Sequence, residues 1–363
     1  MAIFWMIIIV TILALLQVTY YNKRALKAVT YERRFSTNEV FTGDRLELIE
    51  ILANNKLIPV PWVRVESRIS VSLKFKKQEN LDINMEQFHK SLFYLGPYSR
   101  ITRRHEIHCL KRGYYDCSKI SIVAGDLFGL GRDSRDQIEE AARLYVLPQI
   151  LKADELPEAA VKWQGEVSVR RWILPDPIFV SGIREYRSGD ILKDVHWGAT
   201  ARTGILQVKV RDYTVSPKIM LVFNTQISDR LIGGMNPEDI DFLEEGINIC
   251  AALAAWCVNS GLEVGFMSNG AAQIGRTDTP SLQMGCSQIH LKDLLRQLAT
   301  LVIKMQTGIH AVLDKQIKDG FSGMDILIIS AYWSETIEKR AAQLRNNGNT
   351  VTYIPIGGGG RNG

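Results

Sequence analysis

The chain opens with an uninterrupted apolar stretch. Residues 2–21, AIFWMIIIVTILALLQVTYY, contain no charged side chain. At a helical rise of about 1.5 Å per residue, such a stretch matches the roughly 30 Å hydrocarbon layer of a bilayer. Trp5 lies near one end and Tyr20 and Tyr21 at the other, where aromatic side chains favour the membrane–water interfaces. The pattern predicts a transmembrane anchor over residues 1–21.

Residues 22–35 form a basic juxtamembrane segment with a single acidic residue, Glu32. Its basic residues are Lys23, Arg24, Lys27, Arg33 and Arg34, and none precedes the apolar stretch. The positive-inside rule then predicts a single-pass protein of the cell membrane, with residues 22 onward in the cytoplasm. A cleaved secretory signal is the alternative, but it needs a basic start, a shorter apolar core and small residues at the cleavage site. Residues 17–20, QVTY, do not provide such a site.

Apolar and polar residues alternate through much of residues 36–150. Residues 45–51, 62–66 and 101–107 all show this period of two, and turn-forming residues such as Asn54 and Asn55 separate such runs. Several short strands at this spacing predict a β-sandwich module of immunoglobulin-like shape. No Cys-Trp-Cys arrangement is present, so the prediction is limited to the architecture.

The pattern changes again within residues 217–356. Residues 219–223 are continuously apolar, as in a strand buried on both faces, and Asn236 and Pro237 are suited to begin a helix that extends to Gly261. Further strands are predicted at 262–267, 325–330 and 351–355, with helices at 291–303 and 334–346. This alternation predicts an α/β domain with a largely parallel sheet. Residues 151–216 connect the two modules, and residues 357–363 form a flexible glycine-rich tail.

Composition narrows the classes of function. Of 363 residues, 46% are hydrophobic and 23% charged, as in an ordinary globular protein, and the net charge of +5 is small for a nucleic-acid-binding protein. A basic cluster lies on alternating strand faces without aromatic residues for base stacking: Arg100, Arg103, Arg104, Lys111 and Arg112. We therefore expect no nucleic-acid partner.

The cysteines give no clear sign of a disulfide framework or a metal site. There are five, scattered along the chain, which is typical of a reducing compartment. Cys109 and Cys117 flank a turn, and a zinc site with His105 and His108 is conceivable. Alternation along the strand, however, places His108 on the face opposite His105 and Cys109, which favours a structural role for these cysteines.

Residues 181–211 concentrate polar and aromatic side chains. The candidate site residues there are Arg184, Tyr186, Gly189, Asp190, His196, Trp197 and Arg202. One hypothesis makes Asp190 and His196 an acid/base pair, because a carboxylate can orient an imidazole for proton transfer. The other is a buried network of ion pairs around Trp197, in which Asp190 pairs with Arg202. No serine or cysteine nucleophile accompanies them in a recognisable motif, so the second is favoured.

This segment resembles the signature of the bacterial family called domain of unknown function 58. Arg112-Gly113-Tyr114 and Asp126-Leu127-Phe128-Gly129-Leu130 extend the resemblance, with Leu127 where the family often has proline. The resemblance implies a von Willebrand factor A-like fold for the C-terminal half. It also implies a MoxR-type AAA+ ATPase as partner, in the assembly or maturation of other proteins.

Domains similar to von Willebrand factor A often hold Mg²⁺ in an Asp-x-Ser-x-Ser motif after their first strand. The matching positions here are Asn224, Gln226 and Ser228, so only the last serine is kept. An amide in place of the carboxylate lacks the charge that offsets Mg²⁺ dehydration. We therefore expect a degenerate metal-site loop, with neither metal nor cofactor, that serves as a protein-contact surface.

These observations predict a membrane-anchored, non-enzymatic scaffold or adaptor, in which the residues of the 181–211 segment are structural or contact a partner. No P-loop motif is present, so ATP turnover would belong to the partner. The alternative is a membrane-associated, hydrolase-like enzyme using Asp190 and His196. A third possibility, a metal-dependent adhesion-like binder, is opposed by Asn224. The sequence identifies no small-molecule substrate.

Overall fold

The computed structural model describes most of the chain. The described residues are 2–22, 24–76, 82–83, 86–126, 131–173, 180–188, 190–211, 218–229, 236–272, 279–357 and 361–362. The chain divides into two compact units, Met1–Gln149 with Leu295–Thr300, and Ile150–Leu294 with Leu301–Gly363. The six-part division expected from the sequence stays a prediction at most of its boundaries.

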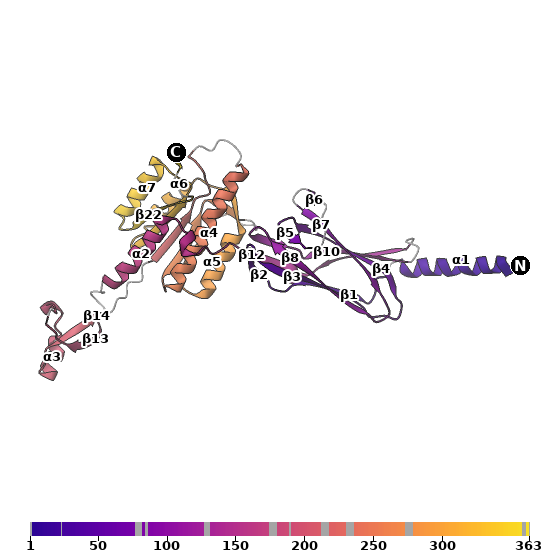
Figure 1. The fold of residues 1–363 in the computed structure, drawn as a ribbon, viewed down its shortest axis with the longest axis horizontal. Helices are drawn as coiled ribbons and strands as arrows, with labels where there is room; N and C mark the ends of the chain where they lie inside the picture. The colour runs from indigo at the N-terminus through magenta and orange to yellow at the C-terminus, as the bar shows by residue number, and fades with distance from the viewer. Residues whose placement is uncertain are drawn as a thin grey trace. The chain divides into compact units, whose positions relative to one another are not determined.

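The N-terminal apolar stretch forms one helix, α1 (Ala2–Tyr21), at the indigo end of the chain in Figure 1. Its segment Ile3–Tyr21 has a mean hydropathy of 2.3 and is long and apolar enough to cross a membrane. Large apolar side chains along this helix are exposed, for example Ile3 at 71% and Leu16 at 61%. A helix that is apolar all round and unburied is suited to a lipid environment. The predicted apolar helix is confirmed.

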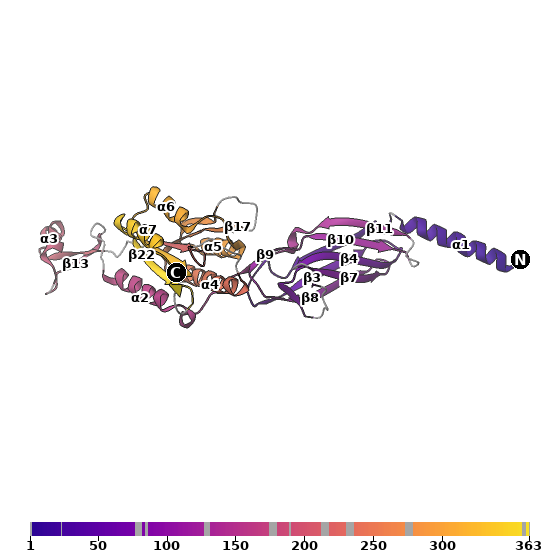
Figure 2. The ribbon, with the colours of Figure 1, turned by 90° about the horizontal axis from the view of Figure 1, so that it is seen from above.

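The first unit is rich in β-structure, as predicted. Two sheets have the orders β1-β3-β8-β5 and β11-β10-β4-β7-β6, and a small third sheet has the order β2-β12-β9. Figure 2 shows β11, β10, β4 and β7 side by side. The strands are β1 Val29–Phe35, β2 Glu39–Phe41, β3 Arg45–Asn54, β4 Val60–Ser70, β5 Leu73–Phe75, β6 Asp82–Ile83, β7 Glu86–Leu95, β8 Arg100–Cys109, β9 Gly113–Asp116, β10 Lys119–Gly125, β11 Arg132–Ile138 and β12 Arg143–Leu147.

Apolar residues of the two large sheets meet in the sandwich core. In one cluster, Leu52 of the first sheet packs with Val63 and Phe93 of the second. In another, Leu48 and Ile107 pack with Ile69. The alternating pattern of the sequence produces this arrangement, because successive side chains of a strand point to opposite faces.

The sandwich begins before residue 36, which corrects the boundary predicted between it and the basic segment. Residues 29–35 form β1, with every second side chain buried, and Ala25 and Leu26 are also buried in the core. Three consecutive charged residues, Glu32 to Arg34, hid this strand from sequence reasoning, because such a run indicates a solvated segment. One of them, Arg33, points inward and is only 1% exposed.

Arg33 belongs to a polar cluster within the sandwich. Its Nη2 donates to Oε1 of Glu50 at 2.7 Å, and both side chains are fully buried. The Tyr31 hydroxyl donates to the same oxygen at 2.6 Å. Oε2 of Glu50 accepts from the Ser91 hydroxyl at 3.0 Å and lies 3.0 Å from Nε2 of His105. These hydrogen bonds offset part of the desolvation cost of the buried ion pair, although Arg33 Nε is buried without a hydrogen-bond partner.

The second unit contains a five-stranded sheet of order β18-β16-β15-β20-β22, in which all neighbours are parallel except β18 and β16. This agrees with the expected α/β pattern, while the von Willebrand factor A-like assignment stays a prediction. Its strands are β13 Val180–Glu185, β14 Gln207–Arg211, β15 Lys218–Phe223, β16 Glu263–Ser268, β17 Gly270–Ala272, β18 Ser281–Gly285, β19 Leu301–Met305, β20 Met324–Ser330, β21 Tyr332–Trp333, β22 Thr350–Pro355 and β23 Arg361–Asn362. Its helices are α2 Glu158–Ile173, α3 Trp197–Thr203, α4 Pro237–Asn259, α6 Ile309–Lys318 and α7 Glu335–Asn346, together with the first part of α5 Gln288–Thr300, whose residues Leu295–Thr300 belong to the first unit.

Helix α4 begins as predicted, since Asn236 is its N-cap and Pro237 its first residue, and Asp239 accepts from the Asn236 N–H at 3.2 Å. The helix expected over 291–303 is shorter at its C-terminal end, because the chain enters β19 at Leu301. The expected glycine-rich tail lies partly outside the described residues, and Arg361–Asn362 pair with β21.

Candidate functional site

The signature segment folds as a β-hairpin that carries a short helix. β13 and β14 pair antiparallel, with a register shift between Val180 and Gly182, and α3 lies between them in the sequence. His196 caps α3, because its Nδ1 accepts the Ala199 N–H at 3.0 Å. Gly204 ends the helix with a φ of 70°, a left-handed conformation that glycine adopts without strain.

Arg184 and Asp190 form a two-pronged ion pair within this hairpin. Nη1 and Nη2 of Arg184 each lie 2.7 Å from a carboxylate oxygen of Asp190. The Arg187 N–H also donates to Asp190 at 2.7 Å. The hydrogen bond from Arg184, together with this N–H, lowers the pKa of Asp190 to about 2. The carboxylate is therefore ionised at neutral pH and unsuited to accept a proton there.

Asp190 and His196 are not brought together as an acid/base pair. The carboxylate of Asp190 is bound by Arg184 and Arg187, while the ring of His196 caps α3. The expected buried pair of Asp190 with Arg202 does not form either, since Arg202 is exposed and Asp190 binds Arg184 instead. Arg184 lies on β13, opposite Val208 of β14 and six residues before Asp190.

The remaining signature residues do not surround a buried centre. Trp197, the expected centre of a buried network, is 69% exposed, which corrects that expectation. Tyr186 is half-buried, and its N–H donates to the Leu206 carbonyl at 2.9 Å. Gly189 lies outside the described residues, as do residues 127–130 of the second motif.

Large apolar side chains of this segment face solvent. Ile191 is 67% exposed and Leu192 66%, close to Trp197 in sequence, and Ile183, Ile205 and Leu206 are exposed as well. Single exposed apolar residues are ordinary on a protein surface, but a concentration of them marks an interaction site. Sequence analysis singled out Trp197 but not its apolar neighbours, because periodicity alone does not distinguish them from core residues.

The degenerate metal-site loop follows β15 and is held by buried amides. Oδ1 of Asn224 accepts from Nδ2 of Asn269 at 3.0 Å and from the Gln226 N–H at 3.1 Å, and its Nδ2 donates to the Ser330 hydroxyl at 2.9 Å. Oε1 of Gln226 accepts the Ile309 N–H at 2.9 Å. Asn224 and Asn269 are fully buried, so their polar atoms form hydrogen bonds within the protein and do not face solvent. Ser228 is half-buried further along the loop.

Asp229, which sequence analysis did not single out, ends the described part of this loop. Its carboxylate accepts from the Tyr332 hydroxyl at 3.1 Å and from the Thr336 hydroxyl at 3.0 Å, and lies 3.9 Å from Nε2 of His310. Partial burial alone would raise the pKa of Asp229, but hydrogen bonds from hydroxyl groups hold it below its usual range. Little in the sequence points to Asp229 as a site residue, because its partners Tyr332, Thr336 and His310 are far from it along the chain.

No group of three or more His, Cys, Asp or Glu side chains suited to hold a metal ion occurs among the described residues. Cys109 at the end of β8 and Cys117 directly after β9 are buried free thiols. Burial raises the pKa of each thiol to about 12. They are therefore protonated at neutral pH and poor metal ligands.

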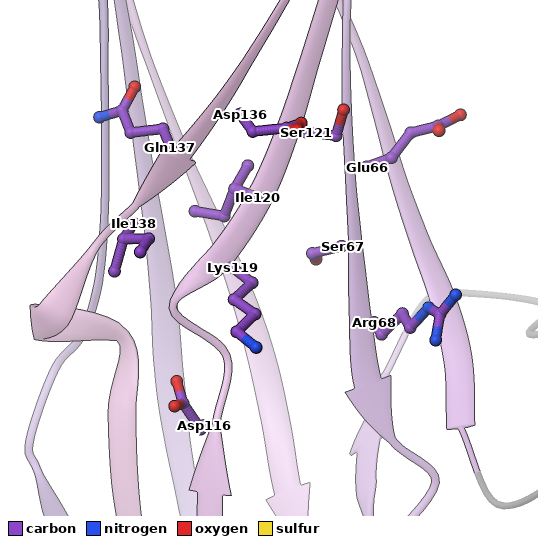
Figure 3. A pocket seen from close by; sticks show the side chains of 10 residues that line it. All are labelled: Glu66, Ser67, Arg68, Asp116, Lys119, Ile120, Ser121, Asp136, Gln137 and Ile138. Carbon is purple, nitrogen blue, oxygen red and sulfur yellow. The ribbon is translucent and has the colours of Figure 1, made fainter.

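A surface groove of about 790 Å³ lies on the sandwich, along β4, β10 and β11. Figure 3 shows its charged side chains of both signs, among them Glu66, Asp116 and Lys119. Hydrogen bonds from Ser118 and the nearby cations Arg143 and Lys119 hold the pKa of Asp116 below its usual range, although burial opposes them. The groove contains no pair of groups arranged for acid/base or nucleophilic chemistry among its lining residues.

Comparison with known proteins identifies a family for the C-terminal half. Residues 182–356 match the model of a family described as "Protein of unknown function DUF58". No curated protein matches the chain.

Three solved structures with local similarity have low TM-scores, which carry no argument about function. The CARDB domain of a Pyrococcus furiosus protein in complex with di-metal ions is 16% identical over 31% of this chain and 91% of its own, with a TM-score of 0.20. The Pseudomonas fluorescens alkylpurine DNA glycosylase AlkC, bound to DNA containing an abasic-site analog, is 16% identical over 33% of this chain and 31% of its own, at 0.21. AvmM, which catalyzes macrocyclization in alchivemycin A biosynthesis, is 9% identical over 34% of this chain and 93% of its own, at 0.22.

Proposed function

This chain belongs to the family described as protein of unknown function DUF58, and we propose that it is a membrane-anchored, non-enzymatic scaffold that binds a partner protein through residues 182–206. Helix α1 provides the membrane anchor, and the basic residues after it favour a cytoplasmic position for both units. The α/β unit, which we propose to be von Willebrand factor A-like, presents the binding hairpin.

The observation that carries this proposal is the exposure of Trp197, Ile191 and Leu192 on a hairpin whose own geometry is fixed. The ion pair of Arg184 with Asp190 closes its turn, and the His196 cap starts its helix. A fixed backbone with exposed aromatic and aliphatic side chains is what a protein-binding site requires, because little conformational entropy is lost on binding.

We propose a MoxR-type AAA+ ATPase as the partner, on the basis of the family resemblance. The chain itself has no P-loop, so its contribution would be to position the ATPase at the membrane. The partner's client proteins would then be assembled or matured there.

The alternative, a hydrolase-like enzyme using Asp190 and His196, lacks support from their geometry. The first is bound to Arg184 and the second caps a helix through its Nδ1. The Asn224 loop likewise gives no support to a metal-dependent adhesion-like binder, since its buried polar groups bind one another.

Capture from a detergent extract tests the proposal. Wild-type protein should retain an AAA+ ATPase identified by mass spectrometry, and Trp197→Ser should reduce its recovery about tenfold or more, because a buried interface tryptophan contributes about 2 kcal/mol. Ile138→Ser is the matched control, since Ile138 is 65% exposed on the sandwich. Equal recovery with Trp197→Ser and wild type would contradict the proposed binding site.

A further inference from the structure

The junction between α1 and the sandwich is a fixed joint. The Tyr21 hydroxyl donates to the Pro59 carbonyl at 2.6 Å, and the Leu26 N–H donates to Asp133 at 2.9 Å. The ammonium group of Lys56 donates to the Ala25 carbonyl, and the Asn55 N–H to the Ala28 carbonyl at 2.8 Å.

Burial strengthens this joint. Tyr21 is 6% exposed, and Ala25 and Leu26 are buried in the same core cluster as strands of both sheets. The helix end and the β3–β4 turn therefore behave as one body, in contrast to a helix on a flexible linker.

This joint determines how far the β3–β4 turn lies from the bilayer. If α1 crosses the hydrocarbon layer, Tyr20 and Tyr21 lie at its surface. Pro59, whose carbonyl accepts the hydrogen bond from the Tyr21 hydroxyl, then lies at the same depth. Leu57 is two residues from Pro59, within about 7 Å along the chain. The headgroup layer on each side of the hydrocarbon is about 5–7 Å thick. Leu57 therefore lies at the headgroup layer.

The side chains at this end of the sandwich are apolar and unusually exposed. Leu57 is 70% exposed, and Ile58 next to it is 37% exposed. Tyr98 in the neighbouring β7–β8 turn is 71% exposed, and its N–H donates to the Lys56 carbonyl at 3.1 Å. Aliphatic residues beside an aromatic one are the usual composition of a surface that inserts into the bilayer interface.

Tyr98 also adopts a strained backbone conformation. Its φ is +46°, in the left-handed region where glycine or asparagine is the usual residue. Strain of this kind persists at functional positions. Here it holds a large amphipathic side chain outward in the turn that is hydrogen-bonded to the β3–β4 turn.

The charge of this end is complementary to anionic headgroups. Arg24, Lys27, Arg100 and Arg132 are exposed there. Of the acidic residues nearby, Glu32 is exposed, Asp133 accepts the Leu26 N–H and Asp126 is fully buried, so the four exposed cations outnumber them. Exposed cations next to apolar residues favour an anionic lipid surface.

We propose that the end of the sandwich formed by the β3–β4 and β7–β8 turns is a second membrane-contact site, which inserts Leu57, Ile58 and Tyr98 into the phospholipid headgroup layer. This site would hold the sandwich, and α1 with it, at a defined angle to the membrane. The inference rests on the membrane anchoring in the proposed function.

Spin labels report the environment of single positions directly. The full chain, reconstituted in nanodiscs that contain phosphatidylglycerol, would carry one cysteine at a time on a Cys286→Ser background. Cys286 is the exposed native cysteine, while burial raises the pKa of the other four, which keeps them protonated and unreactive. Oxygen collides preferentially with labels in lipid, and a water-soluble nickel chelate with labels in water.

Leu57→Cys is the test position, with Leu13→Cys as the lipid control and Ile138→Cys as the aqueous control. Leu13 is 59% exposed within α1, and Ile138 lies at the far end of β11 from the joint, roughly 20 Å from Arg132. We expect the oxygen-to-nickel collision ratio at position 57 to be severalfold higher than at 138 and lower than at 13.

The outcomes separate this inference from the anchoring itself. If the oxygen-to-nickel collision ratio at position 57 equals the ratio at position 138 while the ratio at position 13 is high, the membrane-contact site is overturned and the anchor remains. A ratio at 13 as low as that at 138 would overturn both.

Discussion

Glu50→Gln removes the negative charge from the buried cluster of the sandwich while almost preserving the shape of the side chain. In the wild-type protein Glu50 faces Arg33 at 2.7 Å, and both side chains are fully buried. The substitution leaves the guanidinium of Arg33 buried without a counter-charge. Tyr31, whose hydroxyl donates to Glu50 at 2.6 Å, then shares a neutral amide oxygen.

The expected loss of stability is large. Removing one partner of a buried ion pair costs about 3–5 kcal/mol, because the remaining charge is desolvated without compensation. For a domain of this size, such a loss lowers the Tm by roughly 10–20 °C. Replacing both charges, in Arg33→Met with Glu50→Leu, should restore much of the stability, since no isolated charge then remains.

Denaturant-dependent hydrogen exchange with mass spectrometry measures this change in the full chain, because peptides from β3 and β8 report the opening of the sandwich alone. Glu47→Gln is the matched control: Glu47 lies on the same strand and pairs with Arg104, but both side chains are exposed, at 43% and 64%. We expect it to change stability by about 0.5 kcal/mol or less. A similarly small effect of Glu50→Gln would refute the argument that an unpaired charge on Arg33 destabilises the sandwich.

Other predictions concern the second unit and the anchor. Asn269→Ala should destabilise the α/β unit by about 1–3 kcal/mol in chemical unfolding, because it removes one donor to Asn224 Oδ1 and leaves the Thr225 N–H without its buried acceptor; a neutral effect would show that water replaces the amide. Calorimetric titration with Mg²⁺ should show no saturable binding, and a micromolar site abolished by Ser228→Ala would contradict the degenerate loop. Asp190 should titrate near pH 2 in carboxyl NMR, so its ion pair with Arg184 is intact above about pH 4 and is lost as the pH falls through 2. Arg184→Ala should raise the midpoint of this titration towards pH 3.8. Protease added to intact spheroplasts should leave residues 22–363 whole, and their digestion would place both units outside the cytoplasm.

Features with a local cause were predictable from the sequence. The apolar helix follows from its composition, and the start of α4 follows from Asn236 and Pro237, whose cap geometry depends on adjacent residues alone. The β-rich nature of the first unit follows from alternation, which every strand imposes on its own sequence.

Features that depend on distant partners were not predictable. Asp229 meets Tyr332 only because the ends of β15 and β20 lie together in the sheet.

The joint between α1 and the sandwich was missed for a similar reason. Basic residues around Ala25 and Leu26 indicate a solvated segment, whereas their burial depends on strands that come later in the chain.

Site-specific photocrosslinking at position 197 in living cells tests whether residues 182–206 bind an AAA+ ATPase, with the same crosslinker at position 138 as control. The crosslinker at position 197 should capture an AAA+ ATPase, and the crosslinker at position 138 should not. Capture of the ATPase from neither position, or equally from both, would contradict the proposal that residues 182–206 bind this partner.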